Sequence, residues 1–214
     1  MSNYIYEAAI AFQNLLPVNY RIVIGRKKQA HTIILSFRED NFLHLSGFHK
    51  LNQFHAYKIK SNRFFHDVID GKITDDTVGN YVSDAKNKND NKIRAESILE
   101  RVKALIQLEK LVDSNHANFF GYDPKNVRGR TNITKASYVI KSSVDETVAT
   151  VVLSFLVDDG INERFNEKNF YVCSMFPLTD RDYTKFQTKY TLLLKEKNSG
   201  DSTKILYKHQ NYNV

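Results

Sequence analysis

The sequence contains few of the residues on which several classes of protein depend. Its 214 residues include one cysteine, Cys173, no tryptophan, 3 prolines and 8 glycines. A single cysteine excludes an intramolecular disulfide framework and a cysteine-rich zinc site, and it favours a reducing compartment such as the cytoplasm. The shortage of proline and glycine argues against long linkers and disordered tails.

Several targeting and ligand-binding signals are also missing. No uncharged apolar stretch approaches the ~20 residues that a membrane span needs, and the N-terminal segment lacks the basic leader of a signal peptide. No glycine-rich phosphate loop follows a strand, and no HExxH pattern or magnesium-binding carboxylate cluster occurs. His44, His49 and His55 lack the i, i+4 spacing of a helical zinc site. We therefore expect no metal, no cofactor and no membrane partner.

Positive charge, by contrast, is abundant. The net charge is +7 and the pI is about 9.3. Residues 20–60 hold eight basic residues and only two acidic ones. A basic field of this kind favours a polyanionic partner such as nucleic acid, through phosphate contacts and the release of counterions. The alternative is a generally lysine-rich composition without nucleic-acid binding.

The first half of the sequence shows helical patterns interrupted by one hairpin. Apolar residues spaced about 3.6 apart predict a helix over residues 3–16. Residues 20–25 and 31–37 are rich in β-branched side chains and predict a hairpin with a basic turn. In the last helix of this half, Glu96 and Arg101 are placed on the solvated face. Further helices are predicted at 61–70, from Thr74 or Asp75 to about Ser83, and at 93–113.

The second half is rich in short β-like runs. Turn residues separate them at intervals of about 10 to 15 residues, which is typical of an antiparallel meander. We therefore predict an α+β fold in which N-terminal helices and a hairpin precede a four- to five-stranded antiparallel sheet. A single domain spanning 1–214 is expected, with a helical and hairpin half at about 1–115 and a sheet half at about 116–214. The predicted strands are 134–142, 147–157, 169–176, 183–196 and 204–209.

Two histidines stand in an apolar stretch at 41–51, NFLHLSGFHKL. His44 and His49 are either core residues with satisfied hydrogen bonds or members of a site. A strand would place Phe42 and His44 on the same side, whereas a helix would separate the two histidines by about 140°. We favour a short helix or helical turn, in which Gly47 permits the close approach of another backbone.

The polar side chains that remain suit metal-independent cleavage of RNA. In that reaction the nucleophile is the substrate's own 2′-hydroxyl, so the protein supplies a base, an acid and cations for the charge that develops on the phosphate. Two histidines can share the acid and base roles. Lysine and arginine can stabilise charge, and serine or threonine can orient a phosphate group.

Four motifs are similar to those of a known family. They are HLSGFHKL, RFFHDVIDGKIT, SYVIK and SMFPLTDRDYTKFQTKYTLLLKEK. With their spacing they resemble the phage-associated nucleases of the barnase/EndoU/colicin E5–D/RelE-like superfamily, specifically the fourth such family defined in prophages of low-GC bacteria. The resemblance covers roughly residues 30–210. It implies helices before an antiparallel sheet, metal-independent ribonuclease activity and a place in the cytoplasm of a bacterial host.

The resemblance also points to a set of site residues. His44 and His49 match the pattern HLxGxHKL and are expected to act as general base or acid and its partner. Phosphate binding is expected at Lys141 in SYVIK, at Ser174 in SMF and at Lys189 on the following strand. Thr188 lies on the same strand and is expected to contact RNA. Independently of the resemblance, the concentration of positive charge predicts RNA contacts at Arg26, Lys27, Lys28, Lys50, Lys125, Arg128 and Arg130.

Two activities stay open for a phage- or prophage-derived protein of this kind. The first is a ribonuclease or nuclease-like toxin with RNA as its partner. The second is a non-catalytic protein that inhibits a host defence component, either a protein or a nucleoprotein, with the nuclease-like fold as its scaffold. They differ in whether His44 and His49 converge with lysine, arginine, serine or threonine in one cleft. The oligomeric state is not predicted.

Overall fold

The chain divides into two compact units, each assembled from two separate stretches of sequence. In the computed structural model, the described residues are 3–77, 91–143, 151–178 and 181–212. We call the two units the helical unit (Met1–Leu16 and Arg38–Glu109) and the barrel unit (Pro17–Phe37 and Lys110–Val214).

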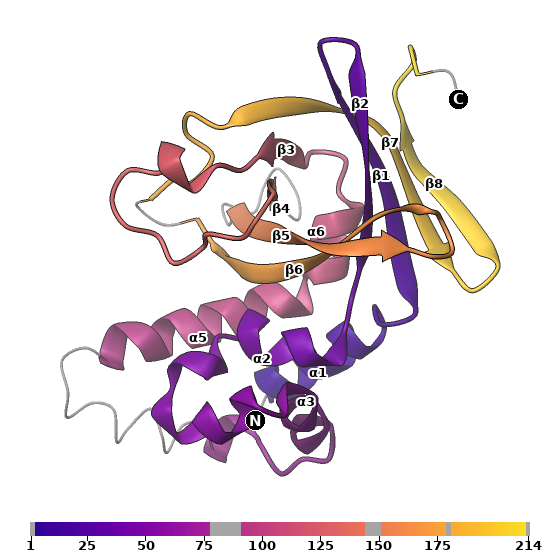
Figure 1. Ribbon diagram of the computed structural model, residues 1–214. Coiled ribbons are helices and arrows are strands. Elements are labelled where there is room, and N and C mark those ends of the chain that lie inside the picture. Colours follow the sequence, from indigo (N-terminus) through magenta and orange to yellow (C-terminus); the bar gives the residue numbers. More distant parts are fainter. Residues whose placement is uncertain (1–2, 78–90, 144–150, 179–180, 213–214) are drawn as a thin grey trace. The chain divides into compact units, whose positions relative to one another are not determined.

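The helical unit consists of short α- and 3₁₀-helices (Figure 1). Among the described helices, none combines the length and the apolar character needed to cross a membrane. The elements are α1 (Tyr4–Gln13), η1 (Glu39–Asn41), α2 (Phe42–Leu45), η2 (Phe48–Lys50), η3 (Asn52–Lys58), α3 (Ser61–Ile69) and α5 (Asn91–Ile106).

The start of α1 is capped by two side chains. Asn3 accepts a hydrogen bond from the backbone N–H of Tyr6 (3.4 Å). The Asp75 carboxylate accepts from the N–H groups of Tyr4 (2.6 Å) and Ile5 (3.0 Å). These donors have no partner within the helix, and a carboxylate also interacts favourably with the helix dipole. A residue 70 positions away in sequence therefore fixes where α1 begins.

Six phenylalanines form the core of the helical unit. Their ring centroids lie 5.2 to 6.2 Å from a neighbouring ring, in tilted or edge-to-face arrangements. Such pairs add attraction beyond the burial of apolar area. Because the rings come from α1, α2, η2, η3 and α3, one cluster holds five elements together. The buried rings are Phe12, Phe42, Phe48, Phe54, Phe64 and Phe65.

Most predicted helices of this unit are confirmed. The helix predicted at 61–70 is α3, and the helix predicted at 93–113 is split into α5 and α6 (Leu108–Asp113). The helix predicted from Thr74 or Asp75 begins at Asp75. Its continuation towards Ser83 lies outside the described residues.

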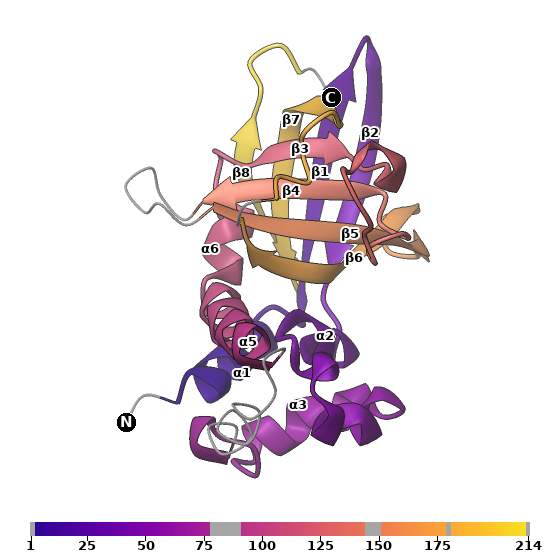
Figure 2. The same cartoon turned by 90° about the vertical axis from the view of Figure 1, so that its left-hand side faces the viewer.

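The barrel unit contains a sheet that closes on itself (Figure 2). The strands pair in the order β1-β2-β6-β5-β4-β3-β7, and pairing of β1 with β7 closes a seven-stranded barrel. β8 pairs with β7 outside this ring. The β2–β6 pair is parallel and the other pairs are antiparallel. The strands are β1 (Val18–Arg26), β2 (Gln29–Ser36), β3 (Asn118–Gly121), β4 (Tyr138–Ser143), β5 (Val151–Asn162), β6 (Glu167–Pro177), β7 (Thr188–Ser199) and β8 (Ser202–Lys208).

The prediction of a four- to five-stranded antiparallel sheet is therefore wrong, because the described residues form eight strands. The predicted hairpin is part of the sheet, since β1 also pairs with β7. The sequence does not predict β3, because this strand has only four residues and a turn-rich segment follows it. Residue patterns identify strands, but they do not specify which strands share backbone hydrogen bonds.

The C-terminal end of α6 is tied to β1 and β7. Lys195 is completely buried and donates hydrogen bonds to the carbonyls of Val112 (2.8 Å) and Ser114 (2.5 Å). The Tyr20 hydroxyl donates to Asp113 (2.6 Å). Burial lowers the pKa of Lys195 to about 8, against the opposing influence of Asp113. A buried amine thus satisfies carbonyls that a helix end leaves without partners.

The β1–β2 hairpin ends in a two-residue turn made of lysines. Arg26 pairs with Gln29, so Lys27 and Lys28 are the central residues, with φ of 48° and 67°. Type I′ turns place asparagine and glycine in this left-handed region, and other residues cost roughly 1 kcal/mol each there. The tip projects beyond the strands β3 to β6 (Figure 1, Figure 2).

Candidate functional site

The histidine stretch at 41–51 is helical, but it is not one helix. α2 stops before Gly47, which has a φ of 86°, and η2 follows it. This break brings the ring centroids of His44 and His49 to 4.4 Å, with 38° between the ring planes. An uninterrupted helix would keep the two side chains about 140° apart. The glycine is therefore what allows the two rings to meet.

Buried contacts hold this turn in place. The Ser46 hydroxyl donates to the backbone carbonyl of Phe42 (2.7 Å) and lies 3.2 Å from that of Leu43. The Phe42 carbonyl also accepts from the backbone N–H of Ser46 (2.9 Å), so the hydroxyl adds a second hydrogen bond at the end of α2. The apolar side chains of the stretch are buried, including Leu45 and Phe48. The two histidines are thus carried by a well-packed support, which limits their movement.

A buried arginine lies against the same turn. Arg101 of α5 is 6% exposed, and a Cβ added at Gly47 would lie 2.9 Å from its Cδ. The expectation that Arg101 lies on the solvated face is wrong. Three residues after Ile98 and four before Leu105, it falls on the buried stripe of α5. This spacing is the signal in the sequence that identifies it.

The pKa of His49 is strongly lowered. Burial and then the neighbouring His44 ring lower it from 6.5 to about 4. The Leu43 carbonyl is close enough to favour the protonated ring and opposes this, whereas Lys50 and Arg101 act in the lowering direction. The Nδ1 atom of His49 is buried and forms no hydrogen bond with the described residues. His49 is therefore a neutral imidazole at neutral pH.

The pKa of His44 is also lowered, although the side chain is exposed. Contact with its neighbours removes part of the ring from water, which is the largest cause. Lys58 lowers the pKa as well, and Asp40 raises it. Arg38 binds Asp40 through two hydrogen bonds, of 3.2 and 3.0 Å. Two neutral imidazoles in contact form a coupled pair, because protonating one disfavours protonation of the other.

The cluster therefore combines two neutral bases with three cations, Arg101, Lys50 and Lys58. Groups of this kind can accept a proton from a hydroxyl and stabilise an oxyanion. Across the part of the chain that is described, no three His, Cys, Asp or Glu side chains are grouped so as to hold a metal ion.

An open depression adjoins the cluster through Asp40, which also acts on the pKa of His44. Its volume is about 510 Å³. It carries charges of both signs, so an extended ligand with alternating polar groups fits it better than an apolar one. The depression is lined by Arg38, Glu39, Asp40, Ile59, Lys60, Ser61 and Asn62.

The phosphate-binding residues predicted in the barrel unit do not converge. Ser174 on β6 and Lys189 on β7 lie on strands that do not pair, with β2 and β1 between them on one side of the closed sheet and β5, β4 and β3 on the other. Lys141 forms an ion pair with Asp182 (2.9 Å), and this carboxylate neutralises the charge of the lysine. Thr188 is the first residue of β7. The row of paired residues that separates Ser174 from Lys189 runs through Ser174, Phe155, Val139, Phe120 and Lys189.

The predicted RNA-binding cations of the barrel unit are exposed, in two groups, whereas Thr188 is half-buried. One group is the hairpin tip and the other is a basic loop. Arg181 holds this loop by donating to the carbonyls of Arg128 (2.6 Å) and Arg130 (2.8 Å). The loop backbone is thus held in place while its basic side chains stay exposed, and the Arg128 guanidinium lies over the Phe186 ring at 5.8 Å. The exposed residues are Arg26, Lys27, Lys28, Lys125, Arg128 and Arg130.

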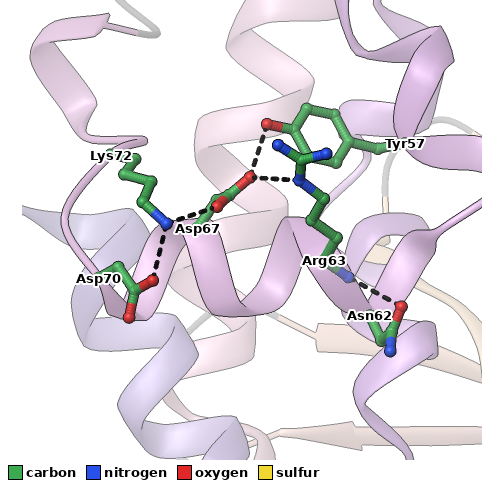
Figure 3. A network of polar contacts seen from close by, with 6 residues as sticks. All are labelled: Tyr57, Asn62, Arg63, Asp67, Asp70 and Lys72. Atoms are coloured by element: carbon green, nitrogen blue, oxygen red, sulfur yellow. Dashed lines mark hydrogen bonds and ion pairs between the residues drawn. The ribbon is translucent and has the colours of Figure 1, made fainter.

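A second polar cluster in the helical unit surrounds Asp67 of α3, and the sequence did not predict it. Asp67 is 5% exposed and accepts a hydrogen bond from Tyr57 (2.8 Å) and another from Lys72 (3.1 Å). Arg63 lies 3.5 Å away, and Figure 3 shows the three donors around one carboxylate. Burial acts to raise the pKa of Asp67, but these partners together hold it below its usual value.

Comparison with known proteins agrees with the motif resemblance. A family model described as phage-Barnase-EndoU-ColicinE5/D-RelE like nuclease4 matches residues 4–211, nearly the whole chain. The predicted family is therefore confirmed. The chain matches no curated protein and no solved structure.

Proposed function

Because the chain belongs to the phage-Barnase-EndoU-ColicinE5/D-RelE like nuclease4 family, we propose that it is a phage-encoded ribonuclease that cleaves RNA without a metal ion. The observation that carries this proposal is the contact between two neutral histidines, His44 and His49, next to the buried Arg101. A neutral imidazole is the usual general base at neutral pH. Cleavage of cellular RNA would make the protein a toxin of the host cytoplasm.

In the proposed reaction His44 removes the proton of a 2′-hydroxyl. Its ring is exposed and its pKa is lowered, so the neutral form is available to an incoming hydroxyl. The 2′-oxygen attacks the adjacent phosphorus, the bond from phosphorus to the 5′-oxygen breaks, and a 2′,3′-cyclic phosphate forms. The departing 5′-oxygen then needs a proton.

The histidine pair supplies that proton when it carries one proton in total, on the ring that acts as the acid. A phosphate anion placed against the rings favours the protonated form of the ring that it contacts. One proton shared by His44 and His49 then serves as the acid, while the other ring stays neutral as the base. Their 4.4 Å centroid separation allows both rings to face one phosphodiester.

Arg101 is proposed to stabilise the negative charge that develops on the phosphate. Its side chain is buried and packed against Gly47, so it does not have to reorganise during the reaction. Lys50, which is half-buried, and Lys58, which is exposed, add positive charge near the pair.

The barrel unit is proposed to bind the RNA backbone through the hairpin tip, the basic loop at 125–130 and the exposed Lys189 and its neighbour Thr188. Lys141 and Ser174 have weaker support as phosphate ligands. The charge of Lys141 is neutralised by Asp182, and Ser174 lies on β6, which does not pair with the β7 strand of Lys189.

The test compares RNA cleavage by the wild type and by His44→Ala. We expect the variant to lose about 100-fold or more in rate, as is usual for removal of a general base. His66→Ala is the matched control, because His66 is an exposed histidine of α3 that binds Glu39 (3.0 Å). The control is expected to cut RNA at the wild-type rate.

Two further results complete the test. A substrate with a single 2′-deoxynucleotide at the cleaved position should stay intact, and a chelator should leave the rate unchanged. Equal cleavage by wild type and His44→Ala would contradict the proposal. Tight binding of RNA without cleavage would favour the alternative, a non-catalytic inhibitor of a host protein or nucleoprotein.

A further inference from the structure

A cavity in the helical unit opens beside the Asp67 cluster. Its volume is about 440 Å³, which lies within the range of small-molecule sites, about 300–1,000 Å³. We propose that this cavity binds one nucleotide of the RNA, with the base against Tyr57 and the phosphate on Arg63 and Lys72; this inference rests on the proposed ribonuclease function. The lining residues are Phe54, Tyr57, Arg63, Asp67, Lys72, Ile73 and Thr77.

Asp67 acts as the anchor of this site and not as a ligand group. One of its oxygens accepts from Tyr57 (2.8 Å) and lies 3.5 Å from Nε of Arg63, and the other accepts from Lys72 (3.1 Å). Figure 3 shows that these three side chains converge on the carboxylate from different segments. Because Asp67 is buried, it fixes their positions without presenting its own charge to a ligand.

Arg63 and Lys72 keep donors available for an anion. Arg63 uses Nε for Asp67, and its two terminal nitrogens form no hydrogen bond with the described residues. Its side chain is 68% exposed. Lys72 donates to Asp67 and to Asp70 (2.9 Å), which leaves a third N–H. A guanidinium fork beside an ammonium group suits the oxygens of a phosphate.

Tyr57 provides a fixed aromatic surface beside these cations. Its ring contacts Phe64 edge-on with centroids 5.5 Å apart and lies 6.1 Å from Phe54. Its hydroxyl is held by Asp67, so both ends of the side chain are restrained. Every nucleobase can stack on such a ring. An aromatic surface beside hydrogen-bond donors for a phosphate favours binding of a nucleotide over binding of a simple anion.

The position of the cavity relates it to the histidine cluster. Tyr57 and Lys58 are consecutive in η3, and Lys58 lies close enough to His44 to lower its pKa. Both sites are in the helical unit. A nucleotide held at Tyr57 would therefore flank the phosphodiester bound at His44, and the cavity would set which base stands beside the cleaved bond.

The test measures binding of adenosine 5′-monophosphate, adenosine and inorganic phosphate to the full chain by isothermal titration calorimetry. We expect the nucleotide to bind more tightly than either part. Arg63→Gln should weaken nucleotide binding about 10-fold or more, because charge-assisted hydrogen bonds are lost. Tyr57→Leu should weaken it about 5-fold or more, whereas Tyr57→Phe keeps the stacking surface and should change it less than about 3-fold.

Arg164→Gln is the matched control, because Arg164 is an exposed arginine of the barrel unit that donates to the carbonyl of Gly200. It should bind the nucleotide as the wild type does. Equal losses in Arg63→Gln and Arg164→Gln, or phosphate binding as tight as nucleotide binding, would overturn the inference. Nucleotide binding without RNA cleavage would reject the ribonuclease and keep the cavity site; cleavage without nucleotide binding would do the reverse.

Discussion

His49 links protonation to folding at the scale of a single residue. Its pKa is about 4 in the folded protein and near 6.5 in the unfolded chain. Between these pH values the unfolded chain binds a proton that the folded protein does not. The contribution of neutral His49 to the free energy of unfolding is therefore fully present above about pH 6.5 and is lost as the pH drops towards 4. After allowance for partial exposure, we expect His49 to account for a loss of about 2 kcal/mol.

Urea unfolding at neutral pH and at about pH 4.5 measures this loss. His49→Phe keeps an aromatic ring and removes the titrating group, so its free energy of unfolding should depend less on pH across this interval. The exposed His116 provides the control variant, His116→Phe, which should behave as the wild type. The same pH dependence in wild type and His49→Phe would show that another group is responsible.

Gly47 and Gly71 form a matched pair for a second prediction. Both have positive φ, 86° and 74°, so alanine at either position adopts an unfavourable conformation at a cost of about 1 kcal/mol. At Gly71 no atom lies within 4 Å of an added Cβ, whereas at Gly47 the Cδ of Arg101 lies 2.9 Å away. We expect Gly47→Ala to lose about 1 kcal/mol more than Gly71→Ala.

Because Arg101 must move, Gly47→Ala should also cut RNA about 10-fold more slowly than Gly71→Ala. Thermal unfolding and cleavage rates measure the two effects. Equal rates in the two variants would mean that the position of Arg101 against the turn does not matter for the reaction.

At the residue scale, the sequence identifies the two histidines as site candidates but predicts the wrong face of the helix for the arginine. His44 and His49 stand out because polar rings in an apolar stretch need an explanation. The charge of Arg101 predicts a solvated position, whereas its spacing from Ile98 places it on the buried stripe. Its buried position depends on Gly47, which lies more than fifty residues away and leaves room for its side chain.

At the scale of elements, the β1–β2 hairpin combines an unfavourable turn with a concentration of charge. Lys27 and Lys28 occupy left-handed positions that asparagine and glycine adopt more easily. The double variant Lys27→Asn, Lys28→Gly should therefore raise the free energy of unfolding by about 1 kcal/mol. It should at the same time weaken RNA binding, because two exposed charges are removed from the tip.

Chemical denaturation and equilibrium RNA binding measure these opposite effects. Lys204→Asn with Lys208→Asn removes two exposed charges from β8 and serves as the control for net charge. Equal weakening of RNA binding in both double variants would show that the hairpin tip has no special role. A loss of stability in the hairpin variant would contradict the strain argument.

Elements of the fold were largely visible in the sequence, apart from β3 and the division between α5 and α6. Apolar spacing predicted the helices because a helix face is formed by residues three and four apart. The strand-like runs predicted β4 to β8 with shifted ends. β3 has only four residues, which is too short for an alternating pattern to emerge.

At the scale of the whole molecule, the net charge of +7 predicts a strong dependence of RNA binding on salt. If the seven exposed cations of the hairpin tip, the basic loop and Lys189 each contact a phosphate, the logarithm of the binding constant should fall linearly with the logarithm of the salt concentration, with a slope of about −5. The hairpin double variant should reduce this slope by about 1.4. Titrations at several salt concentrations measure it, and a slope near −1 would contradict the proposed contacts.

The sequence by itself determined the class of protein, the family motifs and the local character of most segments, because these depend on composition and on residues that are close along the chain. The tertiary structure alone decided that the sheet closes, since residues as distant as Val18 and Ser199 pair across β1 and β7. It also decided that His44 meets His49 beside Arg101. Strand partners and buried charges are set by long-range contacts, which no local pattern encodes.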